Sequence, residues 1–349
     1  MVTKYPYPKP SETKANFNNL LKVLRRQKPE RPVLFEFFLN DPLYRLLAGK
    51  GSEELKDDKP YDRERLAIQA YYNAGYDYAT VRGSQLAFQS GSHQQIQTRS
   101  LNDGVTIKDR KSFEEYKWPE PDDFDYNMLV ALAADLPEGM KLIVYGPGGV
   151  LENVIALAGF DNLCLLMADD PELTGKIFDA VGSRLLRHYE KALKFETVGA
   201  IISNDDWGFK TQPMLSPADM RKYVIPWHRK IAAAAHKAGR PAILHSCGNL
   251  DSLMDDIIDD IGYDGKHSYE DAIKPVEDAY EELHARIAVL GGIDVDFITR
   301  SPPEQIYRRS RAMLERAGER GGYALGTGNS VPEFIPHENY FAMLAAARG

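Results

Sequence analysis

The chain is poor in cysteine, with only two in 349 residues, Cys164 and Cys247. Cys164 lies in the apolar run 163–167, whereas Cys247 lies between polar residues and a glycine. A disulfide framework is not implied by two residues in such different settings. We expect Cys164 to belong to the core, and Cys247 is a candidate for chemistry.

Long apolar runs and an excess of positive charge are also missing. No segment reaches the roughly 18 apolar residues of a membrane span. Residues 1–17 hold prolines and charges where a signal peptide has an apolar stretch. The formal net charge is −8, which disfavours nucleic acid and anionic membranes as partners. The sequence therefore predicts a soluble cytoplasmic protein.

What the sequence does contain predicts the fold. Hydrophobic residues make up 43% of the chain, enough for one large core. Short apolar runs alternate with amphipathic helical stretches, a pattern typical of parallel strands joined by crossover helices. The eight candidate strands are 32–38, 76–81, 141–146, 198–203, 241–246, 263–268, 286–292 and 321–328. This count predicts an α/β protein with a single (β/α)8 TIM barrel domain over residues 1–349.

Two stretches exceed a minimal barrel. Residues 83–126 are polar, contain an Asn-Asp-Gly turn and are expected to form a rim or lid excursion after the second strand. Residues 1–30 hold an amphipathic helix around Ser11 to Arg26. This helical extension is expected to cap the bottom of the barrel or to join a partner chain, so a homodimer is one expectation.

Polar residues collect where the predicted strands end. In a barrel of this kind those positions share one mouth, so we expect the active site there. The strand ends and the turns that follow them hold Glu36, Arg82, Glu152, Asn204, Asp205, Asp206, Trp207, His245, Cys247, His267 and Asn329.

The pair His245 and Cys247 is the sharpest signal in this set. Residues two apart on an extended chain share a face, so the imidazole and the thiol can converge on one ion, and this pairing suits zinc. A third ligand would be needed, and it would have to be a carboxylate. In the alternative interpretation Cys247 is a small buried residue and His245 bonds a carboxylate without metal.

Asp205 and Asp206 are adjacent acids ahead of Trp207. They face different directions on a strand end, so at most one is expected to point into the mouth. Desolvation by the tryptophan would raise the proton affinity of that acid and suit it to act as a general acid. The alternatives for either acid are a helix N-cap or an arginine partner. Arg82 is expected to bind a substrate carboxylate or to pair with an acid of the rim.

Several runs in the back half resemble a known family. They are NDDWGFKTQPMLSPADMRKYVIPWHRKIAAAAHKAG, ILHSCGNL, VLGGIDV and GGYALGTGNSVPEFIPHENYFAML. Together they resemble the uroporphyrinogen decarboxylase superfamily, and its branch of corrinoid-dependent methyltransferases most closely. The front half is similar in layout only.

Two departures narrow what the resemblance implies. The runs FFLNDPLYRLL and VRGSQLAF lack the arginine-rich motif and the acid of true decarboxylases. Methyltransferases of methanogens have a further zinc-binding cysteine on strand eight, where this chain has Thr327 between two glycines. That difference argues against a coenzyme M acceptor. The resemblance therefore implies the methyltransferase component of an O-demethylase system, which passes a methyl group to cob(I)alamin on a corrinoid protein.

The resulting hypothesis places a small methylated substrate, a phenyl methyl ether, near His245 and Cys247 or near an ion that they hold. Asp205 or Asp206 would protonate or orient it. Glu152 and Glu36 are the spare carboxylates for a metal. The residues expected to shape the substrate pocket are Glu36, Arg82, Asn204, Trp207, Cys247, His267 and Asn329. Two rival functions remain, a decarboxylase or lyase with Arg82 and Lys266 as anion anchors, and a non-catalytic module that binds corrinoid proteins.

Overall fold

The structure, a computed structural model, describes residues 5, 14–49, 60–91 and 100–348. Within these ranges seven strands form one sheet, ordered along the chain from β1 to β7. Every neighbouring pair is parallel. The strands are β1 (Tyr78–Val81), β2 (Lys141–Tyr145), β3 (Val198–Asn204), β4 (Ala242–His245), β5 (Gly265–His267), β6 (Ala288–Leu290) and β7 (Tyr323–Ala324). The predicted α/β class and parallel sheet are confirmed.

The segment 32–38, predicted as the first of eight strands, is not a regular strand. It meets β7 through a single parallel bridge between Leu34 and Leu325. On its other side Tyr78 and Thr80 of β1 donate their hydroxyls to two of its backbone carbonyls, at 2.8 and 2.7 Å. Because side chains occupy these carbonyls, no backbone ladder to β1 forms among the described residues. The sheet thus curls into a TIM-like barrel that this segment closes.

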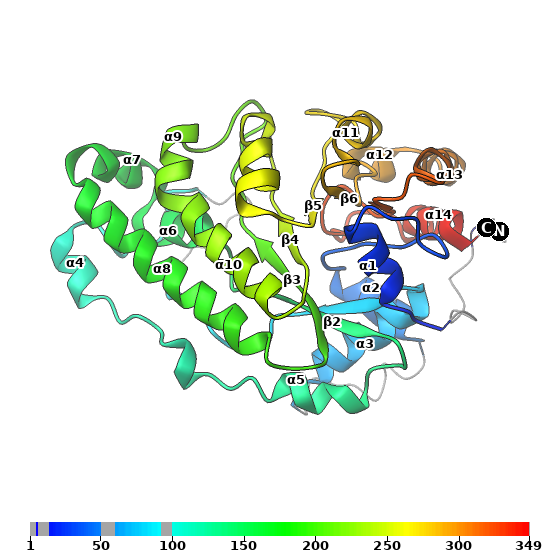
Figure 1. Ribbon diagram of the computed structural model, residues 1–349, viewed down its shortest axis with the longest axis horizontal. Helices are drawn as coiled ribbons and strands as arrows, with labels where there is room; N and C mark the ends of the chain where they lie inside the picture. The colour runs from blue at the N-terminus through cyan, green and yellow to red at the C-terminus, as the bar shows by residue number, and fades with distance from the viewer. Residues whose placement is uncertain (1–4, 6–13, 50–59, 92–99, 349) are drawn as a thin grey trace.

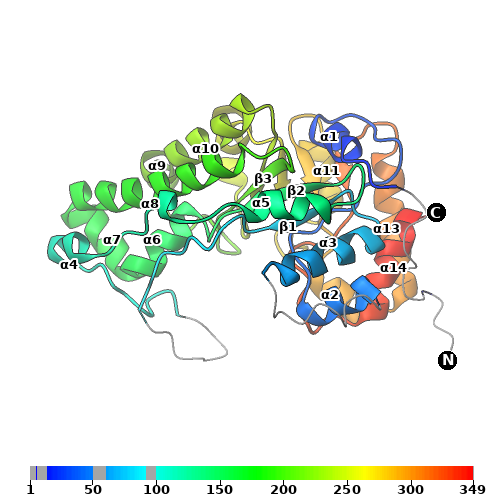
Figure 2. The ribbon, with the colours of Figure 1, turned by 90° about the horizontal axis from the view of Figure 1, so that it is seen from below.

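Helices surround the sheet (Figures 1 and 2). The larger helices are α2 (Asp41–Ala48), α3 (Asp62–Ala74), α6 (Val150–Ala158), α7 (Phe160–Asp169), α8 (Pro171–Ala192), α10 (Ile225–Lys237), α11 (Val276–Leu283), α13 (Pro303–Ala317) and α14 (His337–Arg348). The shorter ones are α1 (Asn18–Leu24), α4 (Arg110–Glu115), α5 (Met128–Ala131), α9 (Pro217–Asp219) and α12 (Val295–Arg300). The short 3-10 or π turns are η2 (Pro121–Asp123), η3 (Leu132–Ala134), η4 (Met220–Val224), η5 (Asp251–Leu253) and η6 (Asp256–Ile261).

The two stretches outside the minimal barrel are described only in part, since residues 11–13 and 92–99 lie outside the described ranges. Helix α1 buries Leu20, Val23 and Leu24. From residue 100 onward the chain after β1 runs along α6, where two successive backbone amides, at 106 and 107, donate to the carbonyl of Leu157.

Cys164 was expected in the core, and this expectation is wrong. The residue is exposed on α7, a helix in which Leu163 is the one fully buried residue. The apolar run suggested burial of every residue, but α7 packs on the protein along a narrow stripe only.

In the described part of the chain no single helix is long and apolar enough to span a membrane. Helices α6 and α7 reach that length and hydrophobicity only when taken together, and the pair is bent by 93°.

Candidate metal centre

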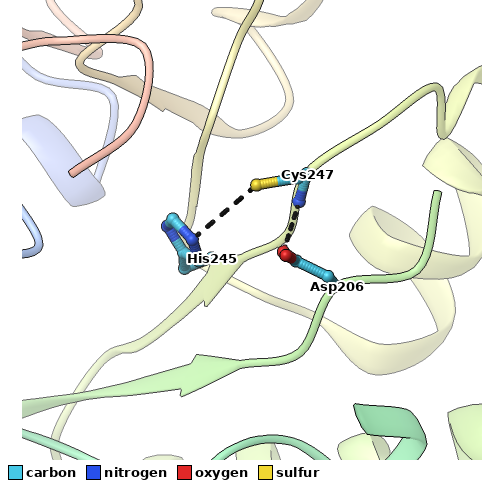
Figure 3. Close-up of side chains that lie close together, drawn as sticks. All are labelled: Asp206, His245 and Cys247. Atoms are coloured by element: carbon cyan, nitrogen blue, oxygen red, sulfur yellow. Dashed lines mark hydrogen bonds between the residues drawn. The ribbon is translucent and has the colours of Figure 1, made fainter. Parts of the chain in front are cut away.

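Three side chains, from the end of β4 and from the loops after β3 and β4, meet at the carboxyl end of the barrel. Asp206, His245 and Cys247 each present a ligand atom, and these atoms all lie within 4.8 Å of one another. The backbone amide of Cys247 donates to Asp206 Oδ1 at 2.8 Å, and Cys247 Sγ lies 4.0 Å from His245 Nε2. Figure 3 shows the carboxylate, imidazole and thiol converging. We call these residues the ligand triad.

Local backbone geometry places the ligand triad. His245 ends β4 and pairs in register with Asn204, the last residue of β3, so the two loops begin side by side. Gly248 has φ of 87°, a left-handed conformation that glycine adopts readily. A Cβ at Gly248 would lie 2.2 Å from the backbone of Gly208. Only a glycine therefore lets the two loops approach closely enough to bring Asp206 to Cys247.

Two polar side chains point at the Cys247 sulfur. Asn329 Nδ2 donates to Sγ at 3.2 Å and Ser268 Oγ at 3.4 Å. Burial, helped by the negative charge of Asp206, raises the pKa of the Cys247 thiol to about 12. The thiol therefore holds its proton at neutral pH unless a cation arrives, and the two donors are already placed to stabilise sulfur as a thiolate ligand.

The imidazole of His245 is oriented by a second histidine. His245 Nδ1 and His267 Nδ1 are 2.8 Å apart, and His267 Nε2 lies 3.3 Å from the carbonyl oxygen of Thr327. A carbonyl only accepts, so His267 carries its proton on Nε2. Burial lowers the pKa of His267 to about 3, so the ring is neutral and its Nδ1 accepts from His245. His245 Nε2 is thereby left without a proton, as a metal ligand must be.

Glu36 is fully buried and contacts Thr327, the residue whose carbonyl faces His267. Its two carboxyl oxygens contact the backbone amide and the hydroxyl of Thr327, both at 2.7 Å. The same hydroxyl also bonds the carbonyl of Asn329. One hydroxyl has one hydrogen, and the carbonyl can only accept it, so a proton on Glu36 completes the second contact. In agreement, burial raises the pKa of Glu36 to about 8. Glu36 is a neutral support for the segment after β7 that carries Thr327.

Asp205, the other acid of the pair, faces away from the ligand triad. Its oxygens accept from the backbone amides of Leu151 and Glu152 in the first turn of α6, both at 2.9 Å. Its Oδ2 also lies 2.9 Å from Nε2 of the buried His228. The hydrogen bonds of the Asp205 carboxylate are thus to α6 and to His228 on α10. The structure therefore gives Asp205 the helix-capping role that was the alternative for either acid.

Two other expected pocket residues also serve the scaffold. The Asn204 amide oxygen accepts from the backbone amide of Gly146 at 3.1 Å, which ties the ends of β2 and β3 together. The ring of Trp207 is fully buried and packs edge-on against His228, with centroids 4.7 Å apart. Neither side chain contacts the ligand triad.

The carboxylate beside His245 and Cys247 is Asp206 rather than Glu152. Glu152 Oε2 accepts from the backbone amide of Gly149 at 3.0 Å, at the start of α6. It nevertheless shares a cavity of about 180 Å³ with Asp206, so it lies within the same region of the mouth. Arg82 stands apart, at the end of β1, where its Nη2 donates to the carbonyl of Leu86 at 2.6 Å.

Sequence reasoning missed some supporting residues. Ser268, Thr327 and His228 each contact a candidate residue, but a lone hydroxyl or a mid-helix histidine gives no recognisable pattern. Lys266, the expected anion anchor of the rival decarboxylase or lyase, is buried. Its Nζ donates to the carbonyl of Ser268 at 2.7 Å, and burial lowers its pKa to about 8. The alternation of β5 places His267 inward and Lys266 outward, under a helical layer.

The donor set of the ligand triad fits a divalent transition metal. An imidazole nitrogen without a proton, a thiol approached by two donors and a carboxylate oxygen are ligands that zinc accepts. Three protein ligands leave a fourth position for substrate, as catalytic zinc sites do. A second layer of contacts, from His267 and Asn329, orients two of the three ligands.

A parallel barrel with a polar centre at the carboxyl ends of its strands defines the class of this protein, an α/β barrel. A family model described as uroporphyrinogen decarboxylase (URO-D) matches residues 98–349. This is more than half of the chain, and the chain belongs to that family.

Individual relatives are distant. A methylated-thiol–coenzyme M methyltransferase of Methanosarcina mazei is 24% identical over 197 residues, 55% of this chain and 49% of that protein. The chain thus spans about half the length of this relative. A uroporphyrinogen decarboxylase of an Anaeromyxobacter species is 24% identical over 247 residues, 69% of this chain and 68% of that protein. The solved structure of a methyltransferase from Methanosarcina mazei superposes with a TM-score of 0.68 at 14% identity, covering 96% of this chain and 99% of that one. This last likeness shows the fold.

Proposed function

We propose that this protein transfers a methyl group from a small methylated substrate, a phenyl methyl ether, to cob(I)alamin on a separate corrinoid protein. The observation that carries the proposal is the convergence of Asp206, His245 and Cys247 at the barrel mouth. Family membership and the similarity to a methyltransferase support the reaction class.

The reaction needs little from the protein beyond alignment and stabilisation of charge. The electron pair of cob(I)alamin forms a bond to the methyl carbon as the bond from carbon to oxygen breaks. The oxygen keeps the electron pair of the broken bond and leaves as a phenolate, which gains a proton from water on release. A divalent ion held by the ligand triad would supply Lewis-acid stabilisation to that oxygen.

The ligand set favours an oxygen substrate. Where related methyltransferases of methanogens would have a second cysteine, this chain has Thr327, whose hydroxyl bonds Glu36. Asp206 takes the third place instead, and carboxylate is a harder ligand than thiolate. A site with this mixture of donors suits an ether or phenolate oxygen better than a site with two thiolates does.

The approach of the methyl acceptor is also provided for. A cavity of about 1020 Å³ lies over the ends of β5 to β7 and is lined by Tyr269, Asp294 and Asn329 among others. Asn329 bonds the Cys247 sulfur, so this one side chain joins the wall of the cavity to the ligand triad. Its size suits the face of a corrinoid ring presented by a partner protein.

The test mixes the zinc-loaded full chain with cob(I)alamin and a panel of methoxyarenes, and follows the absorbance of the corrinoid. Formation of methylcobalamin together with the matching phenol is expected. The variant Asp206→Asn is expected to lose turnover by orders of magnitude, whereas Cys164→Ser, which alters the exposed cysteine, serves as the matched control and keeps it. No methylcobalamin with any methyl ether would overturn the proposal.

The same assay separates the rival functions. A decarboxylase or lyase would consume a carboxylated substrate without any corrinoid, with Arg82 and Lys266 as anchors. Lys266 is buried and directed at backbone carbonyls, which weakens that alternative. A module that only binds corrinoid proteins would form a complex and transfer no methyl group.

A further inference from the structure

A third cavity, of about 660 Å³, opens beside the carboxyl end of β1. Five charged residues line it. They are Arg45, Arg63, Arg82, Asp41 and Glu64. The three arginines outnumber the two acids, so the formal charge of the lining is one positive, in a protein whose overall charge is −8. We call this the basic cavity.

Arg82 is the unusual member of the set. It follows the last residue of β1 and is half-buried. One of its guanidinium nitrogens donates to the carbonyl of Leu86 at 2.6 Å, while Nε is buried without any hydrogen-bond acceptor. Among the described residues no carboxylate forms an ion pair with it. Holding a guanidinium donor inside a protein without an acceptor is costly, so the site is incomplete without an anion.

The rest of the lining restricts which anion fits. Arg63 already pairs with Asp41 on the exposed side, at 3.0 Å, whereas Arg82 offers one positive charge that no described carboxylate neutralises. Phe38, Tyr44 and Leu66 make part of the wall apolar. A planar carboxylate matches the fork of a guanidinium in two parallel hydrogen bonds. A singly charged carboxylate on an apolar body therefore matches this cavity better than a phosphate dianion.

The basic cavity is close to the ligand triad. Tyr145, in its lining, contacts the ring of Phe37 with centroids 5.2 Å apart. Phe37 in turn contacts the ring of His245, with centroids 4.7 Å apart, so the rings of Tyr145 and Phe37 connect the wall of the basic cavity to the ligand triad. Phe38 lines both the basic cavity and the large cavity that contains Asn329. The basic cavity is therefore a neighbour of the large cavity at the barrel mouth.

We propose that the basic cavity binds a carboxylate of the methyl donor through Arg82, which makes the substrate a methoxylated aromatic acid. This inference rests on the proposed function, because it names the class of substrate for the same barrel mouth. Arg82 acts as a specificity-determining residue in binding. The methyl ether lies at the ligand triad and the carboxylate lies at the opposite edge of the ring.

Binding can be tested without catalysis. Calorimetric titration of the full chain with 4-methoxybenzoate and with the neutral 4-methoxytoluene compares substrates that differ in the carboxylate. The acid is expected to bind more tightly to the wild-type protein, and Arg82→Gln to weaken its binding about 10- to 100-fold. Arg82→Lys keeps the charge and loses the fork, so its loss should be intermediate. Arg221→Gln, which alters an exposed arginine paired with Asp256 outside the cavity, is the matched control.

Each outcome has a distinct meaning. Equal affinity for the acid and the neutral ether, or an unchanged affinity in a folded Arg82→Gln variant, overturns the inference. Binding of inorganic phosphate with no binding of the acid also overturns it, because the cavity would then be a phosphate site. If the acid binds through Arg82 while no methyl group reaches cob(I)alamin, the carboxylate site stands and the proposed function fails. If neutral ethers are demethylated as well as acids, the function stands and the carboxylate site fails.

Discussion

Asp205 and Asp206 are neighbours in the chain, yet their carboxylates serve opposite sides of the strand ends. Asp205 binds the first turn of α6 and His228 behind the barrel mouth. Asp206 turns into the mouth, where it accepts from the amide of Cys247 and joins the ligand triad. Successive side chains at a strand end point to opposite faces. One acid is therefore available to the scaffold and the other to chemistry.

This division predicts different consequences for the two acids. Asp205→Ala leaves the buried His228 and two helix amides without their acceptor, so we expect the free energy of unfolding to fall by about 3–5 kcal/mol. Asp206→Asn keeps the shape of a half-buried side chain and should change it by less than about 1 kcal/mol. Urea denaturation of both variants checks this. A larger loss in the Asp206 variant would assign that residue to the scaffold.

Metal binding is the second prediction. The full chain should bind one zinc or cobalt(II) ion, and the cobalt(II) form should show the charge-transfer absorption of a thiolate ligand. Cys247→Ser should abolish this absorption, whereas Cys164→Ser should retain it because Cys164 lies exposed on α7. Metal analysis and absorption spectra of both variants provide the measurement. An absorption that survives in the Cys247 variant would exclude that sulfur as a ligand.

The third prediction concerns His267, which orients His245 without belonging to the ligand triad. Replacing His267 with Phe removes the acceptor of the His245 Nδ1 proton, so metal affinity should fall about 10- to 100-fold. His267→Gln offers a carbonyl to His245 and an amide to the Thr327 carbonyl, and should recover part of the loss. Competition with a chelator of known affinity measures both. Equal affinity in the Phe variant would show that packing alone positions His245.

Sequence patterns were sufficient for most of the barrel because strands and helices have different hydrophobic periods. Seven of the eight predicted strands overlap strands of the structure. The segment 32–38 was apolar enough to read as a strand, but its pairing depends on the hydroxyls of Tyr78 and Thr80. An apolar run indicates that a segment is buried, but it does not indicate which groups form hydrogen bonds with the backbone of that segment. Cys164 was misplaced for a different reason, because an apolar run does not show which side of a helix packs on the protein.

The candidate site was predictable where residues lie close in the chain. His245 and Cys247 were paired by their spacing, and the structure keeps them together. The choice of Asp206 over Asp205 and Glu152 depends on the direction of side chains in two loops that Gly208 and Gly248 hold together. That approach is a tertiary contact between residues 40 positions apart, which no local pattern encodes.

The last prediction follows from the buried Glu36, whose pKa is raised to about 8 by burial. Between roughly pH 4.5 and pH 8 the folded protein holds this proton and the unfolded chain releases it. Rising pH therefore lowers the free energy of unfolding across that window, and Glu36 contributes roughly a few kcal/mol to the change. Above about pH 8 Glu36 makes no further contribution.

Glu36→Gln isolates this contribution, because an amide can mimic the neutral carboxyl, accepting from the Thr327 amide and donating to its hydroxyl. The free energy of unfolding of the wild type minus that of the variant should fall from pH 5 to pH 8 and then level off. Urea denaturation at several pH values measures the difference, in which the other titrating groups largely cancel. A difference that rises with pH would mean that Glu36 is ionised in the folded protein, and the Thr327 hydroxyl would then donate to it rather than to the carbonyl of Asn329.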